Sequence, residues 1–461
     1  MNRLSTACVA AIPVIAARAQ APAVTQHAIS LHGAIVHYTA EAGWIALTGD
    51  STHDVHGRLF YTAYLLAGEN RPVTFVWNGG PGASSTFVHF LGFGPRLLEG
   101  AKFVDNPDTP LPATDLVFVD PIGTGFSRPV SAQFSPEYFS TLGDAKSVTQ
   151  FILTWLKQHK AEKRPVFLMG ESFGGYRAGG VTERMESRGW RVSGVILISG
   201  GAASGPLIPP VVRAALATPP RAAAALVLGK SAPDLGADRT TLVRAATQWS
   251  LDTYLPALRH RDVLTDVQGD SIIQALHRFT GFPAERIDRK TLTIGMEYLK
   301  VMASDSSRPL SPFDMRTPRI PFPDSTAMDE YFRKTLGVRT ELAYWDDPPG
   351  EDPLRPSEKT WVWNYRWTES AKYGTDYAEP WLPHAIAIDP NIKVLVVAGQ
   401  YDATNSCQEN DVLHAMLEPD LAAHYTMRCY LGGHVIYRDP GARVALSADV
   451  SRFVTERLHE R

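Results

Sequence analysis

An apolar run that ends directly in a glycine-bounded serine turn constrains this chain more than any other feature. Residues 165–169, Pro-Val-Phe-Leu-Met, have the pattern of a buried strand, and residues 170–174, Gly-Glu-Ser-Phe-Gly, follow without a spacer. The next segment, 175–188, is helix-like. A strand that turns at once into a helix forces Ser172 into a crowded backbone conformation, and the flanking glycines leave room for neighbouring main chain. We therefore predict that the Ser172 hydroxyl is exposed at the sheet edge, as a nucleophile requires.

Further short apolar runs indicate strands that are covered on both faces. They lie at residues 73–77, 116–119, 195–198 and 394–397, with helix-like periods at 143–159 and 411–417 between several of them. Residues 33–38, 44–48 and 59–66 have the pattern of an antiparallel lead-in. This alternation predicts an α/β fold with a central, mostly parallel sheet and right-handed crossovers.

The alternation of strands and helices breaks between residues 200 and 391. Alanine-rich helical stretches, a proline-rich band and an aromatic region take its place. We predict that residues 200–391 form a helical cap, inserted into a core of residues 20–199 and 392–461. Such a cap would lie over the carboxyl ends of the strands, where open α/β sheets bind ligands. Aromatic residues alternate along part of this region, and we favour packing within the cap over substrate contact as their role. They are Trp361, Trp363, Tyr365 and Trp367.

The first residues have the pattern of a signal peptide. Residues 1–19 combine an early arginine, a mostly apolar run and an Ala-Arg-Ala end, which predicts cleavage after Ala19. The alternative is a membrane anchor, but the run is shorter than the ~20 residues of a spanning helix, and Pro13 interrupts it. We expect a secreted or periplasmic protein whose mature chain does not insert into a membrane.

The charge of the chain excludes some partners. A formal net charge of -3 over 461 residues, without a concentrated basic face, argues against nucleic acid and anionic membranes as general partners. A peptide or another small acyl substrate fits this charge. We expect no cofactor and no metal ion, and nothing in the sequence indicates an oligomeric state.

Two downstream residues complete a catalytic constellation with Ser172. A serine hydroxyl is a poor nucleophile at neutral pH and needs a base, together with an acid that orients the base. Asp402 follows the run 394–397, and His434 follows the strand-like segment 424–430 on a glycine loop. Each alone has an ordinary explanation, as a turn or loop residue. Together with Ser172 they have the Ser…Asp…His order of α/β-hydrolases, and we predict that they form a triad.

A glycine-rich segment is the candidate for the oxyanion site. Residues 78–85, Asn-Gly-Gly-Pro-Gly-Ala-Ser-Ser, follow the strand-like run 73–77. They resemble the glycine turn that supplies one backbone donor to the oxyanion in hydrolases. The N–H of Phe173 would be the second donor. The alternative is a phosphate-binding loop, which is disfavoured because the G-K-[ST] ending and its lysine are absent.

These segments together resemble the serine carboxypeptidase family, also called peptidase family S10. Residues 77–85 are similar to its W-N-G-G-P-G-x-S-S signature, residues 115–127 to its L-D-x-P-x-G-T-G-F-S block, and residues 170–175 to its G-E-S-Y-x-G turn. The resemblance covers the core and leaves 199–391 open. It implies a secreted, bacterial-like member with an α/β-hydrolase fold, which releases C-terminal residues from peptides through an acyl-enzyme on Ser172.

The resemblance also implies roles for residues around the serine. The N–H groups of Gly80 and Phe173 would form the oxyanion hole. Asn78, Gly79 and Glu171 would bind the terminal carboxylate of the substrate, since a protonated carboxyl can donate a hydrogen bond to a carboxylate.

The chain departs from the family pattern at two positions. Gly92 stands where the family has a second glutamic acid, which predicts weaker carboxylate binding and a Glu171 that is protonated only at lower pH. Ala83 replaces a family cysteine, and we predict a different disulfide, Cys407–Cys429. Two other functions stay open: an esterase or acyltransferase that ignores the terminal carboxylate, and a non-catalytic binding protein that keeps only the fold.

Overall fold

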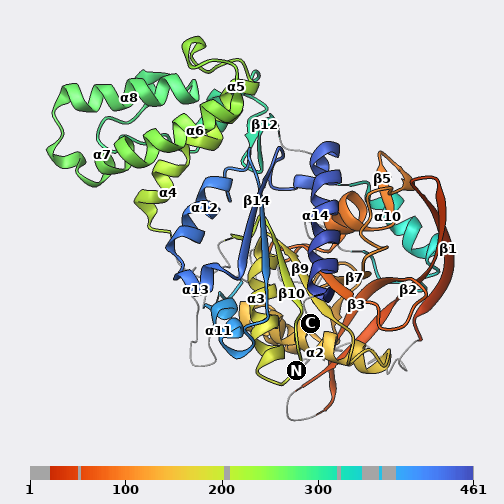
Figure 1. The fold of residues 1–461 in the computed structure, drawn as a ribbon. Coiled ribbons are helices and arrows are strands. Elements are labelled where there is room, and N and C mark those ends of the chain that lie inside the picture. Colours follow the sequence, from red (N-terminus) through yellow and green to blue (C-terminus); the bar gives the residue numbers. More distant parts are fainter. Residues whose placement is uncertain are drawn as a thin grey trace, which may run out of the picture.

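The computed structural model describes residues 21–49, 53–201, 208–318, 323–344, 363–365 and 380–459. The predicted signal peptide, Trp361 and Trp367 lie outside these residues. A mixed ten-stranded sheet forms the centre of the molecule (Figure 1). Its strands lie in the order β1 (Ala23–Leu31), β2 (Ala34–Thr48), β3 (Val55–Leu65), β7 (Asp115–Asp120), β4 (Val73–Trp77), β9 (Val166–Glu171), β10 (Gly194–Ile198), β13 (Val394–Gly399) and β14 (Tyr425–Tyr430), with β8 (Arg128–Pro129) paired to β3.

The strand directions confirm the predicted fold class. Strands β1, β2, β3 and β7 pair antiparallel, as the lead-in pattern predicts. The six strands from β7 to β14 are parallel to one another. Strand β9, which leads into Ser172, lies between β4 and β10 inside this parallel part. The serine turn is therefore flanked by the loops that follow its neighbouring strands.

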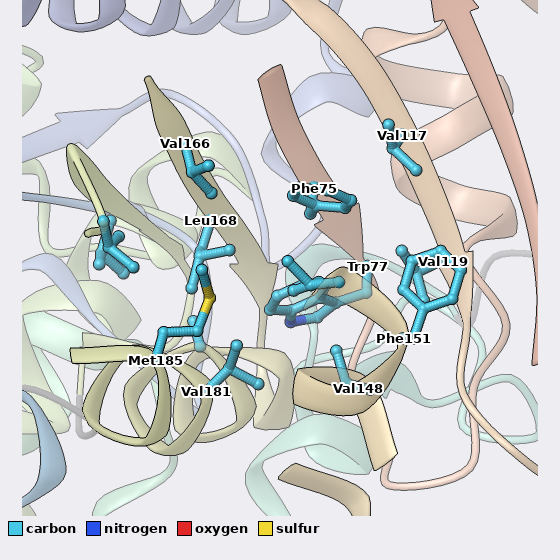
Figure 2. Packing of buried hydrophobic residues seen from close by; sticks show 14 of the residues in the cluster. Phe75, Trp77, Val117, Val119, Val148, Phe151, Val166, Leu168, Val181 and Met185 are labelled. Carbon is cyan, nitrogen blue, oxygen red and sulfur yellow. The ribbon is translucent and has the colours of Figure 1, made fainter. Parts of the chain in front are cut away.

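Helices cover both faces of the sheet, which explains why the core strands are continuous apolar runs. On one face, α2 (Thr141–Gln158) and α3 (Phe173–Glu186) pack against alternate strand residues such as Phe75, Trp77 and Leu168 (Figure 2). On the other face, α14 (Pro440–His459) packs against the residues between them, such as Val76 and Met169.

The region predicted to be an insertion divides into parts with different neighbours. Most of its helices form a lobe with its own apolar cluster, which extends away from the sheet (Figure 1). In contrast, α11 (Trp381–Ile388) packs against α3 in the core, where glycines at 179 and 180 leave room for its side chains. The lobe helices are α4 (Pro210–Leu216), α5 (Thr218–Val227), α6 (Arg239–Trp249), α7 (Leu255–Arg259), α8 (Asp266–Thr280) and α9 (Tyr298–Val301).

The remaining elements are short and lie around the sheet. Two hairpins, β5–β6 and β11–β12, stand outside it as separate two-stranded sheets. The bounds are α1 (Ser135–Tyr138), α10 (Ser325–Glu330), α12 (Cys407–Met416), α13 (Pro419–Ala422), β5 (Arg96–Glu99), β6 (Lys102–Asp105), β11 (Leu310–Ser311) and β12 (Asp314–Pro318).

The two cysteines of the described chain form one disulfide. Cys407, at the start of α12, is joined to Cys429 on β14, with the Cα atoms 5.5 Å apart. The bond therefore ties the segment that follows Asp402 to the strand that precedes His434.

Replacing both cysteines by serine should lower the stability of the fold. The bridge closes a loop with a sequence separation of 22 residues. In the chain-entropy model, a loop of this length contributes about 3 kcal/mol to the free energy of unfolding. Denaturant unfolding of the double variant Cys407→Ser/Cys429→Ser should show this loss, and reductant should destabilise only the wild type. An unchanged unfolding midpoint in the double variant would contradict the bridge.

Candidate active site

Ser172 occupies the sharp turn between β9 and α3. Its backbone has φ 57° and ψ -126°, a region that a residue with a side chain rarely adopts. Its N–H donates to the carbonyl of Ile198 on the neighbouring strand at 2.8 Å. The turn also requires glycine at position 170, where a Cβ atom would lie 2.0 Å from the Gly174 carbonyl oxygen. The predicted strand–serine–helix turn is thus present in the structure.

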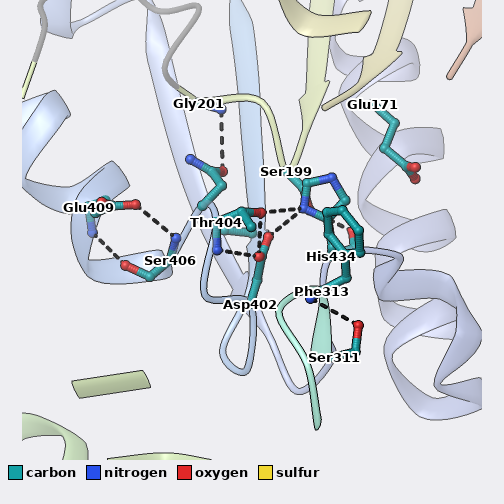
Figure 3. Close-up of polar contacts among 12 residues, drawn as sticks. Glu171, Ser199, Gly201, Ser311, Phe313, Asp402, Thr404, Ser406, Glu409 and His434 are labelled. Carbon is teal, nitrogen blue, oxygen red and sulfur yellow. Dashed lines mark hydrogen bonds and ion pairs between the residues drawn. The ribbon is translucent and has the colours of Figure 1, made fainter. Parts of the chain in front are cut away.

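Asp402 and His434 are in direct contact. His434 Nδ1 lies 2.6 Å from Asp402 Oδ2, and both side chains are buried (Figure 3). An ionised carboxylate only accepts hydrogen bonds, so Nδ1 carries the proton and Nε2 keeps a free lone pair. The contact therefore fixes the tautomer that a general base at Ser172 needs.

Burial and neighbouring charges act on His434 in opposite directions. Burial lowers the pKa of the imidazole, because it penalises the charged form. The negative charge of Asp402, its hydrogen bond and the charge of Glu171 outweigh burial, so the pKa of His434 is raised above its usual value. His434 is therefore a stronger base than an ordinary histidine.

Thr404 is a further residue of this contact, which the sequence reasoning missed. Its hydroxyl and its backbone N–H both donate to Asp402 Oδ1 at 2.7 Å. The same hydroxyl lies 3.1 Å from His434 Nδ1. The Asp-x-Thr spacing is a sequence signal that could have predicted this turn, because aspartate side chains often accept from the backbone two residues on.

The hairpin β11–β12 supports the loops of Asp402 and His434 from outside the sheet. The carbonyl of Phe313 accepts from His434 N–H at 2.6 Å, and the carbonyl of Pro312 accepts from Ala403 N–H at 2.9 Å. The guanidinium of Arg316 donates two hydrogen bonds to Asp314 and lies 4.3 Å from the centre of the Tyr401 ring. This part of the predicted insertion therefore belongs to the wall of the site.

Ser172 and His434 line the same cavity, which has a volume of about 640 Å³. In the described part of the chain, a hydrogen bond joins Asp402 to His434, but no hydrogen bond joins Ser172 to His434. In ligand-free enzymes such bonds are often long and tighten only when substrate is bound. The cavity also takes in the glycine loop and the hairpin: its lining includes Asn78, Gly79, Gly80, Glu171, Phe313, Arg316 and Arg438.

The glycine loop lies directly against the serine turn. A Cβ atom at Gly79 would lie 2.5 Å from the Phe173 nitrogen and 2.6 Å from the Glu171 carbonyl oxygen. Only glycine permits this approach. Gly80 has φ +100° and lines the cavity, and Trp77 Nε1 donates to the Gly174 carbonyl at 2.8 Å. The structure thus brings together the two segments predicted to supply the oxyanion donors.

Glu171 is buried and bonded at both carboxyl oxygens. Asn78 Nδ2 donates to Oε1 at 2.8 Å, and the hydroxyl of Tyr437 donates to Oε2. Asn78 Oδ1 in turn accepts from the backbone N–H of Val88 at 3.1 Å. Asn78, Gly79 and Glu171 are therefore close together, but a residue that the sequence reasoning missed, Tyr437, is part of the same network.

The aromatic segment 363–365 lies beside the serine turn. Trp363 Nε1 donates to the hydroxyl of Thr141 at 3.1 Å, at the start of α2. The rings of Trp363 and Tyr365 lie 5.4 and 6.4 Å from the ring of Phe173. These two residues pack against the core helices next to the site.

The part of the chain that the structure describes offers neither a membrane-spanning helix nor a metal-ligand cluster. No helix in that part of the chain is both long and apolar enough to cross a bilayer. Within the same ranges, His, Cys, Asp and Glu side chains do not form a group of three that could hold a metal ion.

Comparison with known proteins supports the family resemblance. The serine carboxypeptidase family model matches residues 32–188. Pheromone-processing carboxypeptidase KEX1 from Verticillium alfalfae is 31% identical over 166 residues, which cover 32% of this chain and 25% of that protein. Serine carboxypeptidase-like 5 from Arabidopsis thaliana is 29% identical over 131 residues, 26% of this chain and 29% of that protein. The match therefore spans only about a quarter of these relatives.

A solved structure extends the likeness in fold beyond the matched segment. The crystal structure of Kex1(delta)p, a prohormone-processing carboxypeptidase from Saccharomyces cerevisiae, has a TM-score of 0.51 and is 14% identical. The alignment covers 91% of this chain and 92% of that chain. At this identity the likeness supports the fold, and the family match confirms the resemblance over the glycine loop and the serine turn.

Replacing Asp402 by asparagine should remove most of the activity and change its pH dependence. The asparagine amide favours the wrong tautomer of His434, and an expected loss in kcat is about 10⁴-fold. The wild-type kcat/KM should rise with pH as His434 loses its proton, with a midpoint above 6.5, because the Asp402 charge raises that pKa. Steady-state kinetics on a neutral ester should show that the midpoint of the kcat/KM pH profile is lower in Asp402→Asn than in wild type. The control variant Asp420→Asn, which changes an exposed aspartate, should keep the wild-type midpoint. Equal midpoints in the two variants would contradict the role of Asp402.

The change Thr404→Val should have a smaller effect of the same kind. Valine keeps the shape but removes the hydroxyl that donates to Asp402, while the backbone N–H bond is retained. We expect kcat to fall about tenfold, since a hydrogen bond to a charged group contributes about 1.5 kcal/mol or more. The change Thr404→Ser should restore most of the rate, and a Ser variant as slow as the Val variant would contradict this assignment.

Proposed function

We propose, from the family match and the geometry around Ser172, that this chain is a serine carboxypeptidase-like hydrolase. The observation that carries the proposal is the buried Asp402–His434 contact, which opens onto the same cavity as the strained serine turn. In this proposal Ser172 is the nucleophile, His434 the general base and Asp402 the residue that orients it.

The reaction follows from these roles. Ser172 Oγ attacks the acyl carbonyl of the substrate while His434 Nε2 accepts the hydroxyl proton. His434 then gives the proton to the leaving group, and the acyl group stays on Ser172. A water molecule, activated by the same histidine, attacks the acyl-enzyme and releases the acid. The backbone N–H groups of Gly80 and Phe173 would stabilise the oxyanion, which the contact between their segments supports.

The substrate class has two candidates. The family match supports a peptide that loses its C-terminal residue, with Asn78, Gly79 and Glu171 near the terminal carboxylate. A neutral ester or an acyl group destined for transfer is the second candidate. It is favoured by one observation: both oxygens of Glu171 already accept hydrogen bonds from protein groups.

A secreted or periplasmic location completes the proposal. The signal-like sequence of residues 1–19 supports it. The disulfide supports it independently, because such bonds persist mainly in oxidising compartments.

The nucleophile is tested by labelling with a fluorophosphonate, which reacts with activated serines. Wild type should label rapidly and Ser172→Ala should not, whereas the exposed Ser187→Ala should label like wild type. Equal labelling of wild type and Ser172→Ala would exclude both hydrolase candidates and would favour a non-catalytic binding protein with this fold.

A further inference from the structure

Three arginines line the cavity around Ser172, and they differ in how their charges are balanced. They are Arg308, Arg316 and Arg438. The guanidinium of Arg316 donates two hydrogen bonds to Asp314 and lies 3.6 Å from Asp439 Oδ2, so its charge is balanced within the protein. Arg308 is exposed, and water solvates its charge.

Arg438 is neither paired nor fully solvated. It is half-buried at the end of the short 3-10 helix η9 (Ile436–Arg438), which follows the His434 loop. Among the described residues, no hydrogen bond or ion pair engages its guanidinium. Burial lowers the pKa of Arg438 and outweighs the opposite influence of Tyr437 and Asp314. A cation that has lost part of its water without gaining a partner is unfavourable, and an anion that enters the cavity would relieve this cost.

The carboxylates of the cavity wall are already engaged and do not serve as this partner. Both oxygens of Glu171 accept from other side chains, and both oxygens of Asp314 accept from Arg316. Asp439 Oδ1 accepts two backbone N–H groups at the start of α14, at 3.1 and 3.3 Å, while Oδ2 faces Arg316. The cavity therefore presents one half-buried cation whose counter-charge has to come from a bound molecule.

We propose that Arg438 is a specificity-determining residue that pairs with an acidic side chain of the substrate. The preferred substrates are then peptides with Asp or Glu next to the scissile bond. A guanidinium offers parallel N–H donors that match a carboxylate, and removal from water strengthens the pair. This inference rests on the proposed hydrolase function and names the substrate class of the same site.

The surroundings of Arg438 fit an acidic side chain better than the end of the peptide chain. Arg438 lies on the segment after His434, whereas the groups that the family resemblance assigns to the terminal carboxylate lie on the glycine loop and the serine turn. Phe313 is half-exposed in the same cavity, with its ring 5.0 Å from that of His434. This ring offers an apolar surface to the methylene groups of a Glu side chain.

The test compares N-blocked dipeptides that carry Glu with matched peptides that carry Gln, its neutral counterpart of the same shape. The variable residue stands on the acyl side of the scissile bond in one set and on the leaving side in the other. Each peptide is prepared with a free and with an amidated C-terminus. At about pH 7 the Glu side chain is ionised, and the wild-type kcat/KM should favour Glu over Gln about tenfold or more at one of the two positions. Protection of Ser172 from fluorophosphonate labelling measures the same preference for peptides that are not turned over.

Variants of Arg438 separate recognition from a merely structural role. Arg438→Gln removes the charge, so the Glu-to-Gln ratio should fall to about one while kcat/KM for the Gln peptide changes less than about twofold. Arg438→Lys keeps the charge without the planar fork and should retain part of the preference. The matched control is Arg428→Gln, which changes an exposed arginine of β14 outside the cavity lining and should leave the wild-type ratio.

Three results would overturn the inference while the labelling of Ser172 stays intact. They are equal rates for the Glu and Gln peptides at both positions in wild type, a Glu preference that Arg438→Gln leaves in place, and an Arg438→Gln variant that loses only the preference for a free over an amidated C-terminus. The last would assign Arg438 to the terminal carboxylate. Loss of Ser172-dependent labelling in wild type would instead overturn the hydrolase function itself, so the two failures are distinguishable.

Discussion

The buried contact between His434 and Asp402 is the interaction on which the site depends. Two ionisable groups that are removed from water lose solvation, and the loss is offset only by close contact and by further hydrogen bonds. Here Thr404 donates twice to the aspartate, and the carbonyl of Phe313 fixes the histidine backbone. The hydroxyl of Ser199, at the end of β10, donates to the His434 carbonyl at 2.7 Å. His434, the proposed general base, is thus held by segments that are far apart in the sequence.

The parallel sheet explains why these segments meet. Strands β9, β10, β13 and β14 are neighbours, so the loops at their carboxyl ends lie side by side. The disulfide between Cys407 and Cys429 ties helix α12, which follows the Asp402 loop, to strand β14. The glycine loop after β4 approaches from the other side and is fixed by Trp77 and by Arg177, which donates to the Asn78 carbonyl at 2.6 Å. The large buried side chains of Trp77 and Arg177 therefore hold the glycine loop in place.

The sequence predicts the parts of the site that depend on local pattern. The apolar runs predict the core strands. The serine turn and the order of the three proposed triad residues are visible directly in the sequence. Contacts between distant segments could not be predicted in this way. The hairpin β11–β12 lies in a proline-rich band with no strand pattern, yet it contacts His434. Similarly, the sequence does not predict what lies next to Gly92, where a side chain is missing. In the structure, the ring of Tyr437 lies there.

Trapping the acyl-enzyme would show directly whether acyl groups pass through Ser172, as we propose. The protein is mixed with a slowly hydrolysed ester, quenched in acid during turnover and digested for mass spectrometry. If Ser172 is the nucleophile, the peptide that contains Ser172 should carry the mass of the acyl group, and Asp402→Asn should accumulate this acyl-enzyme more slowly. Continued turnover of the ester with an unmodified Ser172 peptide at every quench time would show that Ser172 is not the nucleophile.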